Sequence, residues 1–373
     1  MKSKNIEPHI ATYLHSKGRK LGLPIAGNFE LTARCNFNCP MCYVHRSADS
    51  VEAMGGELTA RQWIDLAAAA QKQGMIFALL TGGEPLLRKD FFEIYDGMKK
   101  LGLMISINTN GSLLKGEVLE RFLQDPPFRF NISLYGGSNE TYRNMCGLPA
   151  YEQVKENIRA LRKAGVEVSL NLSITPWNCG DLERIYADAV ELDVNVKASS
   201  YMYPPIRLED GSFGCGNRLC AGDAAYYSVL WDKIRFTPEE FALRAKNMTG
   251  LVEEAGCPAE VDEGIRCRAG SSSFWVTWQG EMMPCGMMNS PVVKPLEIGF
   301  DAAWAQLREQ TREIRTPKAC LECAYHEVCG VCAAVCLTET GKFDAVPEYI
   351  CQKTREQVRL TREMSQMGEK HDY

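Results

Sequence analysis

The sequence predicts an α/β fold, a partial (βα)6 TIM-like barrel followed by a cysteine-rich C-terminal domain. Apolar, β-rich runs alternate with helix-period segments along the first two hundred residues, which predicts a parallel sheet covered by helices. Glycines stand where these helices end and the next strands begin. Cysteines then accumulate in the last third of the chain, which marks a second, differently built part.

The elements follow from the period of the apolar residues. The predicted strands cover 28–33, 75–80, 103–109, 129–134, 166–174 and 194–198. The predicted helices cover 59–72, 90–100, 114–123, 151–164 and 181–191. Segments 271–278 and 282–288 predict a β-hairpin that turns at Gln279 and Gly280. Segments 201–205 and 211–220 interrupt this periodicity, and we expect them to form a connecting loop over the barrel mouth.

A chain of 373 residues is long enough for more than one domain. We expect an N-terminal extension over 1–27, a barrel with its connecting loop over 28–245, and a cysteine-rich domain over 246–373.

The composition is that of a mildly acidic globular protein. Hydrophobic residues make up 45%, charged residues 24%, and the net charge is -5, so nothing suggests an electrostatic grip on nucleic acid. No stretch is apolar and long enough to cross a bilayer or to act as a signal peptide, and we expect a cytoplasmic protein without membrane contact. Sixteen cysteines in such a protein favour metal over disulfides.

Polar residues follow four consecutive predicted strands, where parallel barrels carry their chemistry. The first strand is followed by Cys35, Cys39 and Cys42, the second by Gly82 to Pro85, the third by 108–111 and the fourth by 133–136. We therefore expect these segments to face one cavity.

The spacing of Cys35, Cys39 and Cys42 predicts an iron–sulfur cluster with an open iron. A [4Fe–4S] cluster is normally held by four thiolates, and three leave one iron free for a substrate. The alternative is a zinc site that His45 would complete as a Cys3His set. The position of the triplet after a strand, with a glycine-rich acidic turn after the next strand, favours the cluster.

CxxxCxxC followed by Gly82-Gly83-Glu84-Pro85 resembles the radical S-adenosylmethionine (SAM) superfamily. The resemblance implies that SAM binds the open iron and is cleaved to a 5′-deoxyadenosyl radical. The residues that it implies as SAM contacts come from the loops after the first four strands and, for Asn171, from the fifth strand itself. They are Tyr43 near adenine, Gly82, Gly83 and Glu84 near the methionyl amino group, and Asn110, Ser133 and Asn171 near the ribose or carboxylate.

One position departs from this pattern. Relatives often place an arginine after the fourth strand, where this chain has Cys146, and Arg143 could substitute for it in pairing with the SAM carboxylate. We expect Cys146 to be a buried small hydrophobe.

The C-terminal cysteines resemble the SPASM extension, which binds two auxiliary [4Fe–4S] clusters in radical SAM enzymes that modify peptides and proteins. The cysteines that carry this resemblance are Cys267, Cys285, Cys320, Cys323, Cys329, Cys332, Cys336 and Cys351. The resemblance implies a distal cluster on Cys320, Cys323, Cys329 and Cys351. It implies a proximal cluster on Cys267, Cys285 and one or both of Cys332 and Cys336, with Cys257 as a further candidate ligand.

Two departures leave alternatives open. Ala333 stands where the family pattern has a cysteine, and a zinc ribbon would also suit the spacing from Cys320 to Cys332. Cys215 and Cys220 fit no cluster; active-site thiols, a redox pair and plain loop residues are the alternatives, and we favour loop residues.

These parts together predict a radical SAM enzyme that oxidises or cross-links a side chain of a peptide or protein. An anaerobic sulfatase-maturing enzyme and a peptide epimerase using a spare cysteine are the enzymatic alternatives, and a multicluster electron carrier is the non-enzymatic one. The expected partners are the peptide or protein substrate and an electron donor of the flavodoxin or ferredoxin type. The 27 residues before the first strand are few for a leader-binding domain, so a separate leader-binding protein is a further possible partner.

Overall fold

The computed structural model describes residues 9–208, 217–254 and 264–368. Within these ranges one sheet runs in the order β6-β5-β4-β3-β2-β1-β7-β8. Its strands are β1 Ala26–Glu30, β2 Phe77–Thr81, β3 Met104–Thr109, β4 Arg129–Ser133, β5 Val168–Ser173, β6 Asn195–Ser199, β7 Ser273–Val276 and β8 Met282–Met283. Neighbouring strands from β1 to β6 pair in parallel, which confirms the predicted α/β class.

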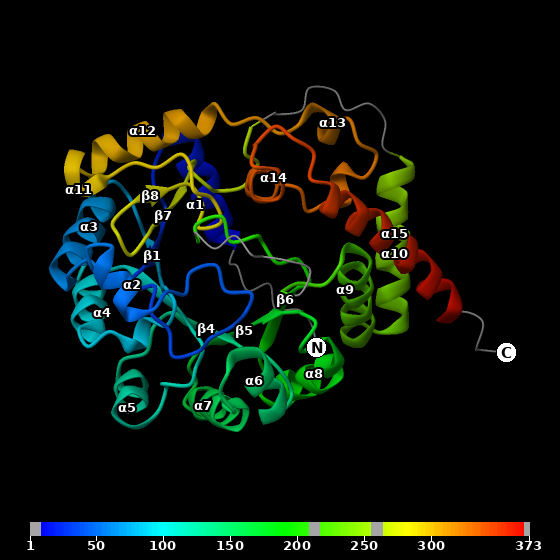
Figure 1. Ribbon diagram of the computed structural model, residues 1–373, viewed down its shortest axis with the longest axis horizontal. Helices are drawn as coiled ribbons and strands as arrows, with labels where there is room; N and C mark the ends of the chain where they lie inside the picture. The colour runs from blue at the N-terminus through cyan, green and yellow to red at the C-terminus, as the bar shows by residue number, and fades with distance from the viewer. Residues whose placement is uncertain (1–8, 209–216, 255–263, 369–373) are drawn as a thin grey trace.

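Helices cover the outer side of this sheet and follow one another around it in Figure 1. Those of the first part are α1 His9–Leu21, α2 Ala48–Ala53, α3 Ala60–Lys72, α4 Phe91–Lys100, α5 Gly116–Gln124, α6 Asn139–Cys146, α7 Tyr151–Lys163 and α8 Leu182–Glu191. The later helices are α9 Ala221–Arg235, α10 Pro238–Glu253, α11 Pro295–Ile298, α12 Phe300–Arg312, α13 Lys318–Leu321, α14 Ala333–Thr340 and α15 Glu348–Gly368. Short 3-10 turns are η1 Pro85–Leu87, η2 Cys179–Asp181 and η3 His326–Val328.

Local sequence explains where the barrel helices begin. Helix α3 starts after Thr59, whose hydroxyl accepts a hydrogen bond from the amide of Gln62 while the Gln62 side chain accepts one from the Thr59 amide. Its Trp63 and Leu66 then point into the core. The predicted helices over 59–72 and 151–164 correspond closely to α3 and α7.

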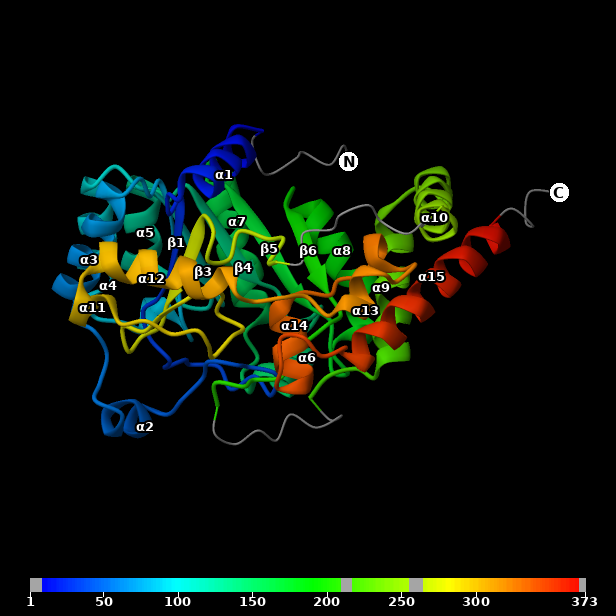
Figure 2. The same ribbon diagram turned by 90° about the horizontal axis from the view of Figure 1, so that it is seen from above.

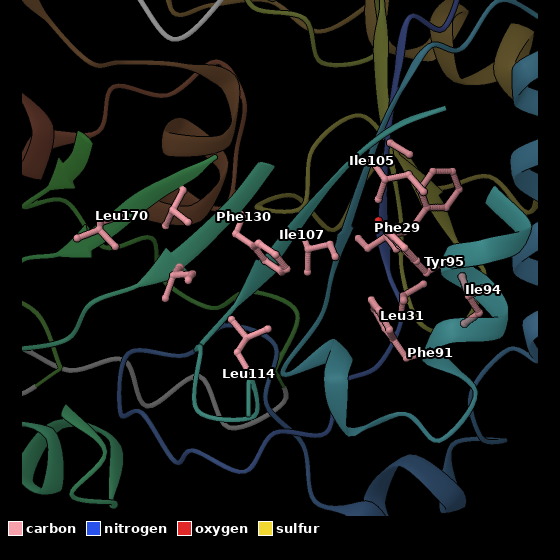
Figure 3. Close-up of a cluster of buried hydrophobic side chains, with 14 of the residues drawn as sticks. Phe29, Leu31, Phe91, Ile94, Tyr95, Ile105, Ile107, Leu114, Phe130 and Leu170 are labelled. Atoms are coloured by element: carbon pink, nitrogen blue, oxygen red, sulfur yellow. The ribbon is translucent and has the colours of Figure 1, made fainter. Parts of the chain in front are cut away.

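The main core lies between the sheet and these helices, as Figure 3 shows. Phe29, Ile107 and Phe130 come from three different strands and are fully buried. The ring of Phe130 packs edge-on against that of Phe122 in α5, with centroids 5.0 Å apart. This packing fixes the strand ends on which the site residues stand.

The C-terminal part joins the same sheet. Strand β7 pairs in parallel with β1, with Phe29 opposite Val276, and β8 returns antiparallel to β7 as the predicted hairpin. Helix α12 contacts the turn after α1 through Trp304, whose indole N–H donates to the Gly22 carbonyl at 2.8 Å. Figure 2 shows α9, α10 and α15 grouped beyond the β6 end of the sheet. Of the described helices, none combines the length and apolar character needed to cross a membrane.

Candidate functional site

The loop after β1 carries Cys35, Cys39 and Cys42. The amides of Phe37 and His45 donate to the sulfurs of Cys35 and Cys42 at 3.4 and 3.3 Å. Burial raises the pKa of the Cys35 thiol to about 12 and also raises that of Cys42. Since iron binds the thiolate, the cost of burying these charges is offset when metal binds. Three partly buried thiols with amide donors therefore fit an iron–sulfur cluster.

The geometry differs from that of a single-ion site. Within the described ranges, no three His, Cys, Asp or Glu side chains converge closely enough to hold one metal ion. The cysteines of a [4Fe–4S] cluster each bind a different iron, so their sulfurs stand farther apart than the ligands of one zinc ion.

A cavity of about 360 Å³ lies beside the three cysteines. Its walls come from the cysteine loop, from the ends of β2 to β6 and from the loop after β6. Six of the predicted SAM contacts line it, namely Tyr43, Gly82, Gly83, Asn110, Ser133 and Asn171. The structure thus brings together residues that are up to 128 positions apart in the sequence, because parallel strands end at one edge.

The glycine pair after β2 permits close packing of this turn against the cysteine loop. A Cβ atom on Gly83 would lie 2.3 Å from the carbonyl oxygen of Arg34, and one on Gly82 would lie 2.5 Å from that of Thr32. The amide of Gly83 donates to the Thr32 carbonyl at 2.8 Å. Backbone atoms therefore hold the two strand-end loops in direct contact at this turn.

Glu84 is fully buried and does not line the cavity in this structure. Its carboxylate accepts hydrogen bonds from the Thr109 hydroxyl at 2.8 Å and from the Asn110 amide at 2.7 Å. Burial raises the pKa of Glu84 to about 7. Glu84 thereby positions the turn that carries Asn110, whose side chain reaches the sulfur of Cys35 at 3.8 Å. Its contact with SAM stays a prediction.

Arg143 and Cys146 lie on α6, which sequence periodicity missed. Arg143 is exposed and does not line the cavity. Cys146 is buried, as expected, and a hydrogen bond with Cys146 is the main reason why the pKa of Cys39 is raised. Its own sulfur donates to the Tyr142 carbonyl at 2.9 Å.

An ion-pair network that the sequence did not reveal anchors the cysteine loop. Glu57 pairs with Arg34 at 2.7 Å and with Arg88 at 3.4 Å. Arg88 is buried, and its guanidinium donates to the Leu31 carbonyl of the strand that leads into the loop. No motif signals such a set, because its members are spread over three loops.

The loop after β6 closes the cavity, as the connecting-loop prediction suggested for its described part. Tyr201, Met202 and Tyr203 line the cavity, and Ser199 at the end of β6 adds a hydroxyl that sequence reasoning missed. Arg207 ties this loop to β1 through hydrogen bonds of 3.1 and 2.8 Å to the buried carboxylate of Glu30. Cys215, farther along the predicted loop, lies outside the described residues.

Three further thiols form the set that we call the proximal set, Cys267, Cys285 and Cys332. Burial raises the pKa of Cys285 to about 11, and the nearby Cys267 and Cys332 raise it further. Tyr203 joins this set to the cavity, since its hydroxyl lies 4.0 Å from the sulfur of Cys332. Cys257, the candidate additional ligand, lies outside the described residues.

Four other thiols, the distal set, surround a small cavity of about 30 Å³ between η3 and α15. They are Cys320, Cys323, Cys329 and Cys351. The Thr354 hydroxyl donates to the sulfur of Cys329 at 3.4 Å. Cys336 is fully buried on α14. Burial is the main reason why its pKa is raised, and the nearby thiols of Cys320, Cys332 and Cys329 raise it further. Cys220 is exposed at the start of α9, where its sulfur accepts from the Asp223 amide.

Residues 29–189 match the model of the radical SAM superfamily. The chain is 28% identical over 337 residues to the AdoMet-dependent heme synthase of Methanosarcina barkeri, covering 84% of this chain and 93% of that protein. The fold resembles Streptococcus suis SuiB bound to the precursor peptide SuiA, with a TM-score of 0.66, 17% identity and coverage of 94% and 84%. It also resembles anSMEcpe with bound AdoMet and Cp18Cys peptide, with a TM-score of 0.67, 17% identity and coverage of 92% and 99%.

Fold, cysteine loop and strand-end cavity together fit a protein that holds an iron–sulfur cluster and a small cofactor at the ends of parallel strands. The match over residues 29–189 identifies this part of the chain as a radical SAM domain. The cysteine-rich C-terminal part adds strands β7 and β8 to the same sheet, next to β1.

Proposed function

We propose that this radical SAM enzyme oxidises or cross-links a side chain of a peptide or protein substrate. The observation that carries the proposal is the position of Tyr203, which lines the cavity and contacts Cys332 of the proximal set. An oxidation removes an electron from the substrate, so an electron acceptor beside the cavity suits this reaction class. A reaction that returns a hydrogen to the substrate would not need one.

Cys35, Cys39 and Cys42 would hold the SAM-binding [4Fe–4S] cluster, and the SAM contacts would come from the cavity residues named above. When bound, the cluster and SAM supply a 5′-deoxyadenosyl radical that abstracts a hydrogen atom from the substrate. The protein's own residues orient the cofactor and limit access of water. Phe37, Met41 and Tyr135 provide apolar walls for this purpose.

The proximal and distal sets would hold two auxiliary [4Fe–4S] clusters. The distal set offers four thiols around one small cavity, which matches the usual ligand number. The proximal set has three thiols within the described residues, and Cys336 or Cys257 would supply a fourth.

The size of the cavity supports a substrate that enters by one side chain. A volume of about 360 Å³ lies near the lower end for ligand sites, so SAM would take most of it. Solved structures of this fold that contain bound peptides, SuiB with SuiA and anSMEcpe with Cp18Cys, support a peptide or protein. An electron donor of the flavodoxin or ferredoxin type, a separate leader-binding protein and a cytoplasmic location belong to the same proposal.

A second candidate rests on sequence similarity. The relatives that match most of this chain include AdoMet-dependent heme synthases at 25 to 28% identity, so a heme precursor is an alternative substrate. The epimerase alternative rests on Cys146, Cys215 and Cys220; of these, Cys146 and Cys220 do not line the cavity, and Cys215 lies outside the described residues.

The test is anaerobic reconstitution with iron and sulfide, followed by iron analysis and assay of 5′-deoxyadenosine with SAM and dithionite. We expect about twelve irons per chain, as three [4Fe–4S] clusters require, and loss of SAM cleavage in a Cys35/Cys39/Cys42→Ala variant. Mass spectrometry of candidate peptides then separates a peptide substrate from a heme precursor, which is followed by porphyrin absorbance. Iron-loaded protein that never forms 5′-deoxyadenosine would contradict the proposal and favour the electron carrier.

A further inference from the structure

A second cavity, of about 480 Å³, lies between α1, α12 and the loop that carries Cys267. It shares no lining residue with the cavity beside Cys35, Cys39 and Cys42. Its lining includes Arg19, Arg308, Arg312 and Arg315. Glu309 and Glu313, the neighbouring acids on and after α12, are not part of the lining. The cavity therefore gathers guanidinium groups on a protein whose net charge is -5.

Arg308 is held in place rather than free to turn away. Its guanidinium packs against Gly22, where a Cβ atom would lie only 2.3 Å from the nearest nitrogen. It also lies 6.0 Å from the centre of the Trp304 ring. Arg308 therefore places a positive charge in the cavity lining at a position that its neighbours fix.

Within this cavity, the charges of Arg308 and Arg312 repel one another. In the part of the chain that the structure describes, neither Arg308 nor Arg312 forms an ion pair with a carboxylate. Burial lowers the pKa of Arg308, and the charge of Arg312 lowers it further. An anionic partner would relieve this repulsion, which is the physical reason to expect one.

The cavity adjoins a thiol of the proximal set. The Arg19 side chain donates to the carbonyls of Arg266 and Cys267, each at 3.3 Å. On the other side, the Ser271 hydroxyl donates to the Cys267 carbonyl at 3.3 Å. Among the proposed cluster ligands that the structure describes, Cys267 is the exposed one. A partner seated on the arginines would thus stand next to the most accessible proposed ligand.

We propose that this arginine cavity is the docking site for an acidic one-electron carrier protein. The inference rests on the proposed function, because it takes Cys267 as a cluster ligand. The carrier is oxidised by one electron for each SAM that is cleaved, and the sulfonium carbon–sulfur bond takes up that electron. Arg19 and Arg312 are exposed, so a small anion there would stay largely hydrated, whereas a protein surface gains from several charge contacts at once.

The experiment measures binding of reduced flavodoxin, an acidic carrier, to reconstituted enzyme at low and high salt. The test variant is R308E/R312E, and the matched control is R61E/R359E, which makes the same charge change at exposed arginines outside the cavity. We expect at least tenfold weaker binding for R308E/R312E at low salt, little change for the control, and convergence of all three proteins at high salt. SAM cleavage with dithionite should be equal in the three proteins, while flavodoxin-driven cleavage falls only in R308E/R312E.

Equal flavodoxin affinity of R308E/R312E and the control would overturn the docking site. Because Arg308 packs on Gly22 and Trp304, R312E alone serves as a second variant if the double variant does not fold, and it should weaken binding in the same direction. Titration with inorganic phosphate tests the other kind of occupant. Phosphate binding that depends on the arginines, with unchanged flavodoxin binding, would make this an anion site and contradict the proposal. Arginine-dependent flavodoxin binding without SAM cleavage by dithionite would instead refute the proposed function and leave the docking site standing.

Discussion

The hydroxyl of Tyr203 lies 4.0 Å from the sulfur of Cys332, so a residue of the cavity wall contacts a thiol of the proximal set. Burial is the main reason why the pKa of Tyr203 is raised, and the thiols of Cys332, Cys285 and Cys267 raise it further. Tyr203 therefore stays protonated at neutral pH and is able to donate to the sulfur. Hydrogen bonds to cluster sulfurs are one of the means by which proteins tune reduction potentials.

We expect Tyr203→Phe to lower the midpoint potential of one auxiliary cluster, because it removes a donor that stabilises the reduced, more negative state. A tenfold change in the reduction equilibrium corresponds to about 59 mV, and we expect a shift of that order or smaller. Potentiometric titration followed by electron paramagnetic resonance measures it. Tyr226→Phe, at an exposed position of α9, is the control, and an unchanged potential in Tyr203→Phe would show that the contact does not tune the cluster.

The glycine pair after β2 gives a second prediction. In Gly83→Ala, the new Cβ atom would meet the Arg34 carbonyl at 2.3 Å, so the cysteine loop must move. We expect loss of the SAM-binding cluster, about four irons per chain, and of SAM cleavage. Gly180→Ala is the matched control, since a Cβ atom there meets nothing within 4 Å. Full iron content in Gly83→Ala would mean that the loop adapts without losing the cluster.

Sequence periodicity was sufficient to predict the strands and helices of the barrel, but not the pairing of the C-terminal strands with it. Strands and helices such as β3 and α7 were predictable because each has its own apolar period. The pairing of β7 with β1 was not, because it joins residues 247 positions apart and leaves no local signal. Helix α6 was missed because only Tyr142, Met145 and Cys146 are buried in a short polar segment.

The same distinction applies to the site. Gly83, Asn110 and Ser133 were predictable as cavity residues because each lies at or just after the end of a strand that has a recognisable end. The direction of the Glu84 side chain was not, since it depends on where β3 places Thr109. Tyr203 was missed as a contact of Cys332 because the two residues meet only after the C-terminal part joins the sheet.

The network around Glu57 gives a prediction of stability. Glu57→Ala leaves Arg88, whose side chain is 4% exposed, without its carboxylate partner in this loop, although Asp90 still contacts it. Breaking a buried pair in this way costs about 3–5 kcal/mol, and the remaining Asp90 contact places the expected loss near the lower value. Urea unfolding measures it. Asp65→Ala, which breaks the exposed pair with Arg61, should cost below about 1 kcal/mol, and equal costs for both variants would contradict a structural role of Glu57.

The buried carboxyl of Glu84 gives a prediction of pH dependence. Burial raises its pKa in the folded protein to about 7, from an ordinary value of 4.5. A carboxyl with a raised folded pKa favours folding while it is protonated in both states, and this contribution is lost as the pH rises from about 4.5 to 7. The difference corresponds to about 3 kcal/mol. We therefore expect the free energy of unfolding of the wild type to fall relative to that of Glu84→Gln across this interval.

Denaturant unfolding of both anaerobically reconstituted proteins between pH 4 and pH 8 measures the difference, in which the other titrating groups cancel. A constant difference across that range would mean that the hydrogen bonds from Thr109 and Asn110 outweigh burial and keep Glu84 ionised.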